Sequence, residues 1–520
     1  MKNLVQPGFL FLALCPSLLL HAQTPDIIWK KCFGGSNIDA AYSADLTTDG
    51  GYIIAGGALS SDGDVTVNKG SFDYWIVKSD VSADLQWQKS LGGSGEEAAY
   101  SIQQTTDGGY IVAGYSYSND GDVSGNHGGS DYWILKLNAA GDVEWQKCLG
   151  GSADDVASSI QQTSDGGFIV AGYSSSNDWD VTANYGLSDY WIVKLDGDGN
   201  ISWQKSLGGV NDDQGASIQE ISGGGFIVAG WSGVIGAADY WIINLDADGN
   251  IVWEKSYGGT GNDQATSVRQ TNDGGFIVAG HSYSTDSNIT NQGGADYWVV
   301  KLDAAGNLTW QKSFGGSDED VANAIQQTSD GGFIVAGKSE SDNGDVSPLY
   351  DKHDFWIVKL SAAGSLLWQK SLGGDKDDVA FSIHQTSDNG FMVAGWSIST
   401  DGDIIGSEPN GSRDFWVVKL SSDIESGIAS LTNSSISVYP NPVQNELIIN
   451  LTIPVHKVRM QVCDLQGRTI SIPNNFPNSS TAQNNTVKIN TAELSNGFYT
   501  LRITDEKTGE SKVTKFVKMQ

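Results

Sequence analysis

The chain has 520 residues, of which 39% are hydrophobic and 10% aromatic, so it is long enough for more than one domain and is not disordered throughout. Its formal net charge is −32, and residues 436–520 hold 9 Lys/Arg against 6 Asp/Glu, so the acidic excess lies ahead of residue 436. Such an acidic body argues against nucleic acid and anionic membranes as partners.

The first 22 residues predict a signal peptide. Lys2 precedes an apolar stretch from Phe9 to Leu20, and the small residue Ala22 suits a cleavage site. No later run reaches the roughly 18 apolar residues that a membrane-spanning helix needs. We therefore expect an exported protein without a membrane span, which passes through the periplasm and is secreted or held at the outer cell surface.

Residues 23–420 contain a repeat that tryptophan marks twice in each unit. The first tryptophan follows Asp-Tyr or Asp-Phe, at Trp75, Trp133, Trp191, Trp241, Trp298, Trp356 and Trp416. The second lies at Trp29, Trp87, Trp145, Trp203, Trp253, Trp310 and Trp368. Trp416 has no follower and Trp29 has no predecessor. A linear array has no reason to begin and end with complementary half-units, whereas a closed ring does.

Each unit is predicted to form four strands. Its apolar runs are short, rich in Val, Ile, Phe, Tyr and Trp, and bounded by Gly/Asp/Asn turns such as the one at Asp107. Four strands in a unit of about 58 residues, repeated seven times, predict an all-β, seven-bladed β-propeller. The N-terminal strand, over residues 27–34, would complete the last blade.

The order of the strands decides which residues face the central channel. We assign the Ser-Ile-Gln-Gln-Thr run to the innermost strand, followed outward by the Phe-Ile-Val-Ala-Gly, Asp-Tyr-Trp and Trp-Gln-Lys runs. The segment Leu245–Trp253 has the pattern Leu-Asp-x-x-Gly-x-x-x-Trp. It resembles the turn between the third and fourth strands of quinoprotein-type repeats. The alternative order, with the Asp-Tyr-Trp run innermost, stays open.

Ligand-binding residues are expected where the units differ from one another. The position after Ala-Gly in the second strand lies, in this arrangement, on the face that carries the long loops. It holds Gly57 in the first unit and then Tyr115, Tyr173, Trp231, His281, Lys338 and Trp396. Arg269 and His384 occupy a channel-lining position of the innermost strand that is mostly glutamine.

The fourth unit lacks about eight residues of its loop beside Trp231, which predicts a notch on this face. Aromatic rings flanked by amides and acids could stack on sugar rings and bind their hydroxyls. Ordinary drift between related units is the alternative explanation of these differences.

Recurring acids have a structural interpretation and a metal-binding one. One acid recurs ten positions after each second tryptophan, at Asp39, Glu97, Asp155, Asp213, Asp263, Asp320 and Asp378. The long loops carry Asp-x-Asp pairs, at Asp62 and Asp64, Asp120 and Asp122, Asp178 and Asp180, and Asp401 and Asp403. Spaced carboxylates suit Ca²⁺, which prefers oxygen ligands. Turns capped by aspartate are the alternative, and we expect no other cofactor.

Catalysis has little support in the sequence. The six histidines are scattered, and neither a Cys/His metal-binding spacing nor a Gly-x-Ser-x-Gly motif occurs. The sequence therefore predicts no catalytic residue, and binding is favoured over enzymatic activity.

The composition changes after Leu420. Residues 421–435 form a Ser/Asn/Thr-rich linker, and all 17 tryptophans precede it. The region 436–520 resembles the C-terminal sorting domain of the type IX (Por) secretion system of Bacteroidetes-type bacteria. The matching motifs are Val438-Tyr-Pro-Asn-Pro442, Val462-Cys-Asp-Leu-Gln-Gly-Arg468, Leu494-Ser-Asn-Gly-Phe-Tyr-Thr-Leu-Arg-Ile503 and Thr514-Lys-Phe-Val-Lys518.

Alternating strands separated by Asn/Gly/Pro turns predict a small β-sandwich for this region. The resemblance implies recognition by the outer-membrane translocon, removal of the tail, and release or attachment to surface lipopolysaccharide.

The sequence thus predicts an exported seven-bladed propeller followed by a sorting domain. We expect non-catalytic binding of a glycan or a surface protein at the loop face. The alternative from another class is a secreted polysaccharide lyase or hydrolase that uses the central pocket.

Overall fold

The computed structural model describes residues 24–234, 236–346, 352–407 and 411–423 and, near the C-terminus, 436–439, 443–451, 458–463, 469–470, 486–492, 494–505 and 511–518. Contacts group the described chain into two compact units, Thr24–Asp423 and the residues after Asp423, and each is described by itself. The expected signal peptide and residues 424–435 of the expected linker lie outside the described residues.

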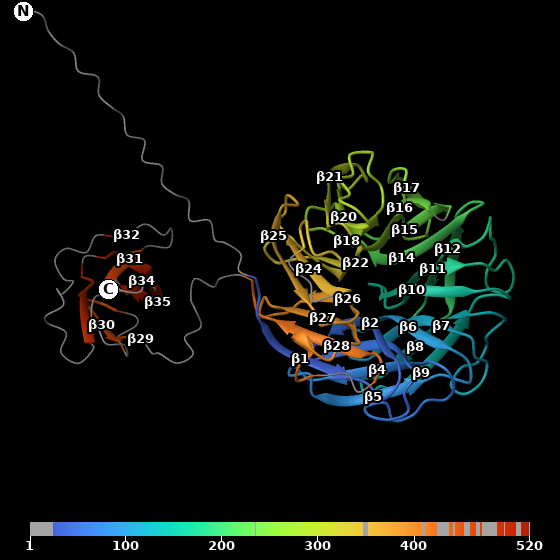
Figure 1. Cartoon of the computed structure of the whole chain (residues 1–520), viewed down its shortest axis with the longest axis horizontal. Coiled ribbons are helices and arrows are strands. Elements are labelled where there is room, and N and C mark those ends of the chain that lie inside the picture. The colour runs from blue at the N-terminus through green and yellow to red at the C-terminus, as the bar shows by residue number, and fades with distance from the viewer. Residues whose placement is uncertain are drawn as a thin grey trace, which may run out of the picture. The chain divides into compact units, whose positions relative to one another are not determined.

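The first unit consists of seven four-stranded antiparallel sheets, arranged as blades around a centre (Figure 1). Blades one to four contain β2 (Asp39–Leu46), β3 (Tyr52–Ala58), β4 (Asp73–Ser79) and β5 (Leu85–Leu91); β6 (Glu97–Gln104), β7 (Tyr110–Ser116), β8 (Asp131–Leu137) and β9 (Val143–Leu149); β10 (Asp155–Gln162), β11 (Phe168–Ser174), β12 (Asp189–Leu195) and β13 (Ile201–Leu207); and β14 (Asp212–Glu220), β15 (Phe226–Val234), β16 (Ala237–Leu245) and β17 (Ile251–Tyr257).

Blades five and six contain β18 (Asp263–Gln270), β19 (Phe276–Ser282), β20 (Asp296–Leu302) and β21 (Leu308–Phe314); and β22 (Asp320–Gln327), β23 (Phe333–Ser339), β24 (Asp354–Leu360) and β25 (Leu366–Leu372). Blade seven joins β26 (Asp378–Gln385), β27 (Phe391–Ser397) and β28 (Asp414–Leu420) to β1 (Ile27–Phe33), and a short 3₁₀-helix η1 (Gly402–Ile404) lies in its loop.

The two ends of the repeat region meet in blade seven. Strand β1 pairs antiparallel with β28, so that Cys32 lies opposite Trp416 and Phe33 opposite Phe415. Figure 1 shows the blue N-terminal strand beside the orange strands of this blade. The predicted all-β propeller, closed by the N-terminal strand, is confirmed. Strand β1 thereby covers the edge of β28 that would otherwise stay open, and the pairing joins the two ends of the repeat region.

The strand order also follows the predicted arrangement. The first strands of the blades line the centre, and the Asp-Tyr-Trp runs form the third strands. Every residue of β4, β8 and β12 is buried, because these strands pack against both neighbouring blades. The alternative order, which placed these runs at the channel, is therefore wrong.

Tyrosine hydroxyls join adjacent blades through the third strands. Tyr132 in blade two donates to the carbonyl oxygen of Trp191 in blade three over 2.9 Å, and the same bond recurs at four other junctions, from Tyr74, Tyr190, Tyr240 and Tyr297. Phe355 and Phe415 replace this tyrosine at the two junctions that involve blade seven, where their rings contact Trp416 and Trp75.

The second unit has two sheets packed around one core. The sheets are β29 (Ile436–Tyr439), β30 (Glu446–Leu451) and β33 (Thr486–Asn490), and β31 (Val458–Cys463), β32 (Thr469–Ile470), β34 (Gly497–Asp505) and β35 (Ser511–Lys518). Leu447 and Ile489 of the first sheet are buried together with Val462 and Leu501 of the second. The unit is a small β-sandwich, as predicted.

Candidate functional site

The centre of the propeller is a cavity of about 720 Å³, lined by the first strands of all seven blades. Two side-chain positions of these strands connect neighbouring blades inside it. The Ser101 hydroxyl accepts the backbone N–H of Ile160, and the Gln103 side-chain carbonyl accepts that of Gln162. Equivalent bonds from the glutamine position recur at Gln161, Gln219 and Gln326. Most of the polar lining therefore serves to hold the ring closed.

Arg269 and His384 line this cavity, at the position expected from the sequence. Arg269 donates to the Ser217 hydroxyl and to the Val268 carbonyl oxygen, at 3.2 and 2.7 Å. The Nε2 atom of His384 lies 2.8 Å from the carbonyl oxygen of Ala44. Burial lowers the pKa of both side chains, and Asp45 in the same lining opposes this shift.

A β-bulge in every first strand turns one more side chain into the channel. In blade one the pairing between β2 and β3 skips from Ala41 to Ser43, which leaves Tyr42 as the extra residue, and the other blades show the same shift. A bulge re-aims the side chain that it displaces. The seven bulged residues are Tyr42, Tyr100, Ser158, Ala216, Thr266, Asn323 and Phe381, and all line the cavity.

Three of the bulged residues are aromatic and belong to consecutive blades. The ring of Tyr42 in blade one packs edge to face against Phe381 of blade seven and Tyr100 of blade two, with centroids 5.3 and 5.1 Å apart. In blades five and six, Thr266 and Asn323 instead donate to backbone carbonyl oxygens of the following blades. The channel wall therefore has an aromatic half, formed by blades seven, one and two, and a small or polar half.

Two residues predicted from the sequence extend this aromatic half toward the loop face. Tyr115 packs against Tyr100 and Tyr117, and its hydroxyl donates to Glu96 over 2.6 Å. Trp396 is almost buried beside Phe381, and the guanidinium of Arg413 lies 3.9 Å from its ring centroid. We call Tyr42, Tyr100, Tyr115, Phe381 and Trp396 the aromatic arc.

The tyrosine hydroxyls of the aromatic arc stay protonated. Burial raises the pKa of Tyr42, Tyr100 and Tyr115 above the usual value, and the Glu96 carboxylate adds to this shift. Within the described chain the Tyr42 hydroxyl donates to no protein group, so it is available to a ligand. Tyr42, Tyr100 and Phe381 are not among the residues predicted from the sequence.

His281 and Lys338 belong to a different cluster, on blades five and six. Lys338 Nζ contacts Glu319 at 2.7 Å and His353 Nε2 at 3.1 Å, and His353 Nδ1 lies 2.9 Å from Asp377. Burial lowers the pKa of His281 to about 4, so this side chain is neutral at physiological pH.

Glu319, Glu340 and His353 of this cluster each offer a ligand atom, and these three atoms lie within 4.8 Å of one another. No spacing in the sequence indicated this group, because its members come from three separate segments. The Lys338 ammonium already supplies a positive charge there.

The predicted Ca²⁺ candidates cap backbone groups. Asp62 accepts the N–H of Ser36 at 2.7 Å, and Asp64 accepts that of Gly34 at 3.2 Å. The same two bonds recur for Asp120 and Asp122, for Asp178 and Asp180, and for Asp401 and Asp403. These contacts favour the turn-capping interpretation.

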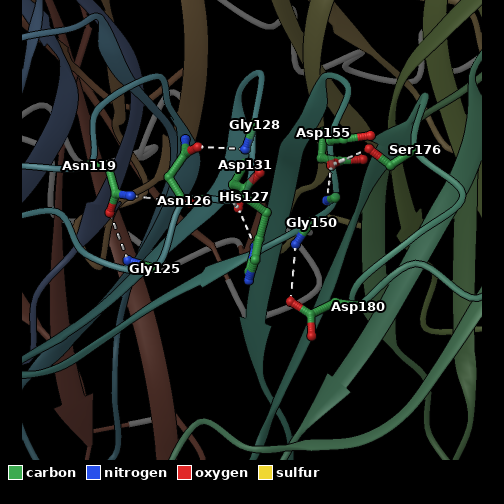
Figure 2. Close-up of polar contacts among 12 residues, drawn as sticks. Asn119, Gly125, Asn126, His127, Gly128, Asp131, Gly150, Asp155, Ser176 and Asp180 are labelled. Atoms are coloured by element: carbon green, nitrogen blue, oxygen red, sulfur yellow. Dashed lines mark hydrogen bonds and ion pairs between the residues drawn. The ribbon is translucent and has the colours of Figure 1, made fainter.

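The recurring first-strand acids are buried and also engaged within the protein. Asp155 accepts the N–H of Gly151 and the hydroxyl of Ser176, at 2.7 and 2.9 Å (Figure 2). Its partners are the backbone and a loop side chain, as the structural interpretation expects. Desolvation raises the pKa of Asp155 to about 6.

Blade four has a pocket of about 360 Å³ where its loop is short, in agreement with the predicted notch. Its lining includes Trp241, Asp213, Glu254 and Lys255, and the segment 208–211. Trp231 is half-buried and is not among the lining residues, and Tyr173 is likewise half-buried.

Comparisons with known proteins support the C-terminal prediction. Residues 437–519 match the family model described as secretion system C-terminal sorting domain. The curated regulatory protein FlaEY of Caulobacter vibrioides is 24% identical over 169 residues, which cover 31% of this chain and 17% of FlaEY.

The solved structures that are similar to the chain include those of PorZ and Sqt1. PorZ of Porphyromonas gingivalis, described as an essential bacterial surface component of the type-IX secretion system, has 12% identity and a TM-score of 0.46, over 94% of this chain and 60% of PorZ. Sqt1 from Chaetomium thermophilum has 11% identity and a TM-score of 0.39, over 82% of this chain and 97% of Sqt1. The chain thus spans less than two thirds of FlaEY and of PorZ.

No helix in the described parts of the chain is long and apolar enough to cross a membrane. The sorting domain implies export to the cell surface or beyond it. The chain is therefore a seven-bladed β-propeller that carries the C-terminal sorting domain of the type IX secretion system.

Proposed function

We propose that the exported propeller is a non-catalytic binding protein that takes up a saccharide at the loop-face mouth of its channel. The observation that carries this proposal is the aromatic arc, in which Tyr42, Tyr100 and Phe381 form a continuous apolar wall over three blades. Sugar rings present apolar C–H faces to such walls, and their hydroxyls need polar partners nearby.

The polar partners of a saccharide are present beside the arc. The Tyr42 hydroxyl is neutral and donates to no group of the described chain, and Asn323 lines the polar half of the same cavity. A cavity of about 720 Å³ has the size of a small-ligand site. A chain end or a short branch of a surface polysaccharide would fit this combination of one apolar wall and one polar wall.

A secreted polysaccharide lyase or hydrolase is the second candidate, because Asp45, Arg269 and His384 influence one another in the same lining. Against it, Asp45 is the one carboxylate among the described residues that line the cavity, and it accepts the backbone N–H groups of Leu46 and Gln104. Glycosidases ordinarily use a pair of carboxylates across the scissile bond.

The test is a saccharide binding screen on the full chain, run with calcium and with EDTA, followed by titration of the best ligand. Tyr42→Ala and Tyr100→Ala should each weaken binding about tenfold, because each removes part of the stacking surface. Ser158→Ala is the matched control, since it changes the equivalent bulged residue of the polar half, and it should weaken binding less. Binding by no saccharide, or equal losses in all three variants, would reject the proposal.

The same screen distinguishes the enzyme. Turnover of a bound polysaccharide that is abolished in His384→Ala or Arg269→Ala would replace the binding proposal by the catalytic one. Loss of binding in EDTA would assign a metal to the loop aspartates.

A further inference from the structure

Blade four differs from the other six in the connection between its second and third strands. In blade two this connection runs from Ser116 to Asp131, whereas in blade four the pairing of β15 with β16 continues to Val234 and Ala237. The longer connections fold back over their own blade. What they contact there shows what the blade-four pocket lacks.

An aliphatic side chain of the long connection covers the third-strand tryptophan. Val123 packs in one buried cluster with Trp133, and Val181 in one with Trp191. Six blades place a buried Val or Ile at this position, at Val65, Val123, Val181, Ile289, Val346 and Ile404. The corresponding tryptophans are at most 1% exposed.

Two aspartates of the long connection accept backbone N–H groups from the segment that enters the blade. In blade three, Asp180 accepts the N–H of Gly150 and Asp178 that of Ser152, at 3.3 and 2.8 Å. Figure 2 shows the bond between Gly150 and Asp180. One Asp-x-Asp-Val segment therefore covers the tryptophan with its valine and accepts two backbone N–H groups with its aspartates.

Blade four lacks this segment but keeps the surface that the segment covers in the other blades. Trp241 is partly exposed in the pocket, in contrast to its six buried counterparts. Gly208 and Val210 are the counterparts of Gly150 and Ser152, and in the described chain their N–H groups donate to no protein acceptor. Such amides are left to water, so a ligand that brings two acceptors can replace that water without losing hydrogen bonds.

The rim of the pocket is apolar and exposed. Val210 and Val234 are 79% and 52% exposed, and the adjacent loop presents Tyr185 and Leu187 at 57% and 61%. This loop lies directly over residues 209 and 210, because a Cβ at Gly186 would come within 2.7 Å of the Val210 backbone. Apolar side chains gathered beside a pocket are typical of protein interfaces rather than of sites for free sugars.

We propose that the blade-four pocket docks a loop of a partner protein that carries the sequence Asp-x-Asp followed by Val or Ile. The aliphatic side chain would cover Trp241, and the two carboxylates would accept the N–H groups of Gly208 and Val210. The partner's loop would thus occupy the place that the protein's own loop fills in the six other blades. The carboxylate of Asp213 lies in the pocket but does not exclude an acidic loop. In the six other blades the equivalent acid lies beside the protein's own long loop.

A difference in the fourth strand refines the expected partner sequence. In blade three, Gln204 accepts the Trp191 indole N–H, and its amide donates to the Thr182 hydroxyl that follows the loop valine. In blade four this glutamine is replaced by Glu254, which lines the pocket and can only accept. The partner residue after the valine should therefore be a donor, and Lys or Arg suits the carboxylate best.

The experiment titrates the full chain with cyclic peptides by calorimetry. The first peptide carries Ser-Asn-Asp-Gly-Asp-Val-Lys, in which the first six residues copy positions 118–123 of blade two, and cyclisation reduces the ordering cost. We expect saturable binding, at least about tenfold weaker binding when both aspartates are asparagine, and a similar loss in Trp241→Ala.

Two further variants distinguish docking from misfolding. Replacing residues 233–238 by residues 117–130 fills the pocket with the native loop of blade two, and it should abolish peptide binding in a folded protein. Glu254→Gln restores the side chain of blade three, so the peptide with Ser in place of Lys should then bind at least as well as the Lys peptide.

Three results would overturn the proposal: no binding by the wild-type chain, binding that the loop replacement leaves unchanged, or equal binding of the Asp and Asn peptides. This site does not depend on the saccharide site, so failure of either leaves the other standing. The Tyr42→Ala variant should bind the peptides normally.

Discussion

Blade four and blade three show what happens when groups that depend on one another disappear together. We call the face opposite the long loops, which carries the short turns, the turn face. There the buried Lys194 of blade three pairs with Asp165 over 2.9 Å, and five other blades repeat this pair. Blade four has Asn244 in place of the lysine and Gly223 in place of the aspartate. Both partners are absent, so neither charge is stranded.

The loop face of blade four differs in the opposite way. There the Asp-x-Asp-Val segment is missing, whereas Trp241 and the amides that it would cover remain. When both partners of a contact within a blade are lost, the change is compensated and no binding surface results. When only one partner is lost, the other leaves a surface that an external molecule can occupy. This contrast separates the pocket from the other irregularities of the repeat.

The largest expected effect compares the two tryptophans. Trp133→Ala in blade two should lower the free energy of unfolding by about 3–5 kcal/mol, because the side chain is fully buried under Val123 and leaves a cavity. Trp241→Ala in blade four should cost clearly less, because its ring is already partly exposed. Urea denaturation of both variants measures the difference, and equal losses would contradict the account of the open pocket.

The second comparison concerns the turn-face pair. Asp165→Asn keeps the turn but leaves the Lys194 ammonium, whose side chain is 8% exposed, without its carboxylate. We expect a loss of about 2–3 kcal/mol in unfolding free energy. Adding Lys194→Asn, which copies blade four, should recover part of that loss. A double variant less stable than Asp165→Asn would show that the joint loss of the lysine and the aspartate in blade four is not a compensated change.

The third prediction is a pH dependence to which several blades contribute. Desolvation raises the pKa of Asp155 and Asp378 to about 6 and that of Asp296 to about 7, so their protonated forms stabilise the folded state. This stabilisation is complete below about pH 4 and is lost as the pH rises through 6 to 7.

Acids of the turn face act in the opposite direction. Hydrogen bonds and the lysine partners lower the pKa of Asp107 and Asp165 to about 2, so their contribution is present above pH 4 and is lost below it. Stability should therefore be greatest near about pH 4 and fall by at least about 2 kcal/mol toward pH 8. Thermal unfolding across this range measures it, and the blade-four loop replacement should show the same profile.

The smallest effect concerns the junctions between blades. Tyr132→Phe removes a buried hydroxyl that bonds to Trp191, and it should cost about 1 kcal/mol of unfolding free energy. Phe355→Tyr tests the reverse at a junction where a phenylalanine ring takes the tyrosine's place. A gain in stability, measured by urea denaturation, would show that this junction lacks only the hydroxyl, and a loss would show that the closing blade has no room for it.

The fold could be predicted almost completely from the sequence. The half-units at Trp29 and Trp416 required a closed ring, and the short apolar runs between turns indicated four strands in each blade. The quinoprotein-like turn at Leu245–Trp253 favoured the strand order that the structure confirms. The strand pattern repeats seven times, so a wrong interpretation of one unit is corrected by comparison with the others.

The aromatic arc was harder to predict, because a β-bulge changes the direction of one side chain without changing the composition of its strand. In the structure, the first strand of blade one, Asp39–Leu46, has 8 residues, and its partner Tyr52–Ala58 has 7. The extra residue is Tyr42.

The tryptophan that lines the blade-four pocket could not be identified from the sequence, because its exposure depends on a tertiary contact. Trp231 stands beside the shortened loop in the sequence, but the side chain that loses its cover is Trp241, because the loop valines of other blades pack on the third strand. Comparing the blades in sequence shows that a loop is missing, and only their packing shows what it covered.

The most direct test of the central claim is hydrogen–deuterium exchange on the full chain, with and without the best saccharide from the screen. We predict that protection concentrates on the first strands of blades seven, one and two, over residues 378–385, 39–46 and 97–104, which carry Phe381, Tyr42 and Tyr100 of the aromatic arc. Protection confined to blades three to six, or to the outer strands, would contradict the assignment of the channel mouth as the binding site.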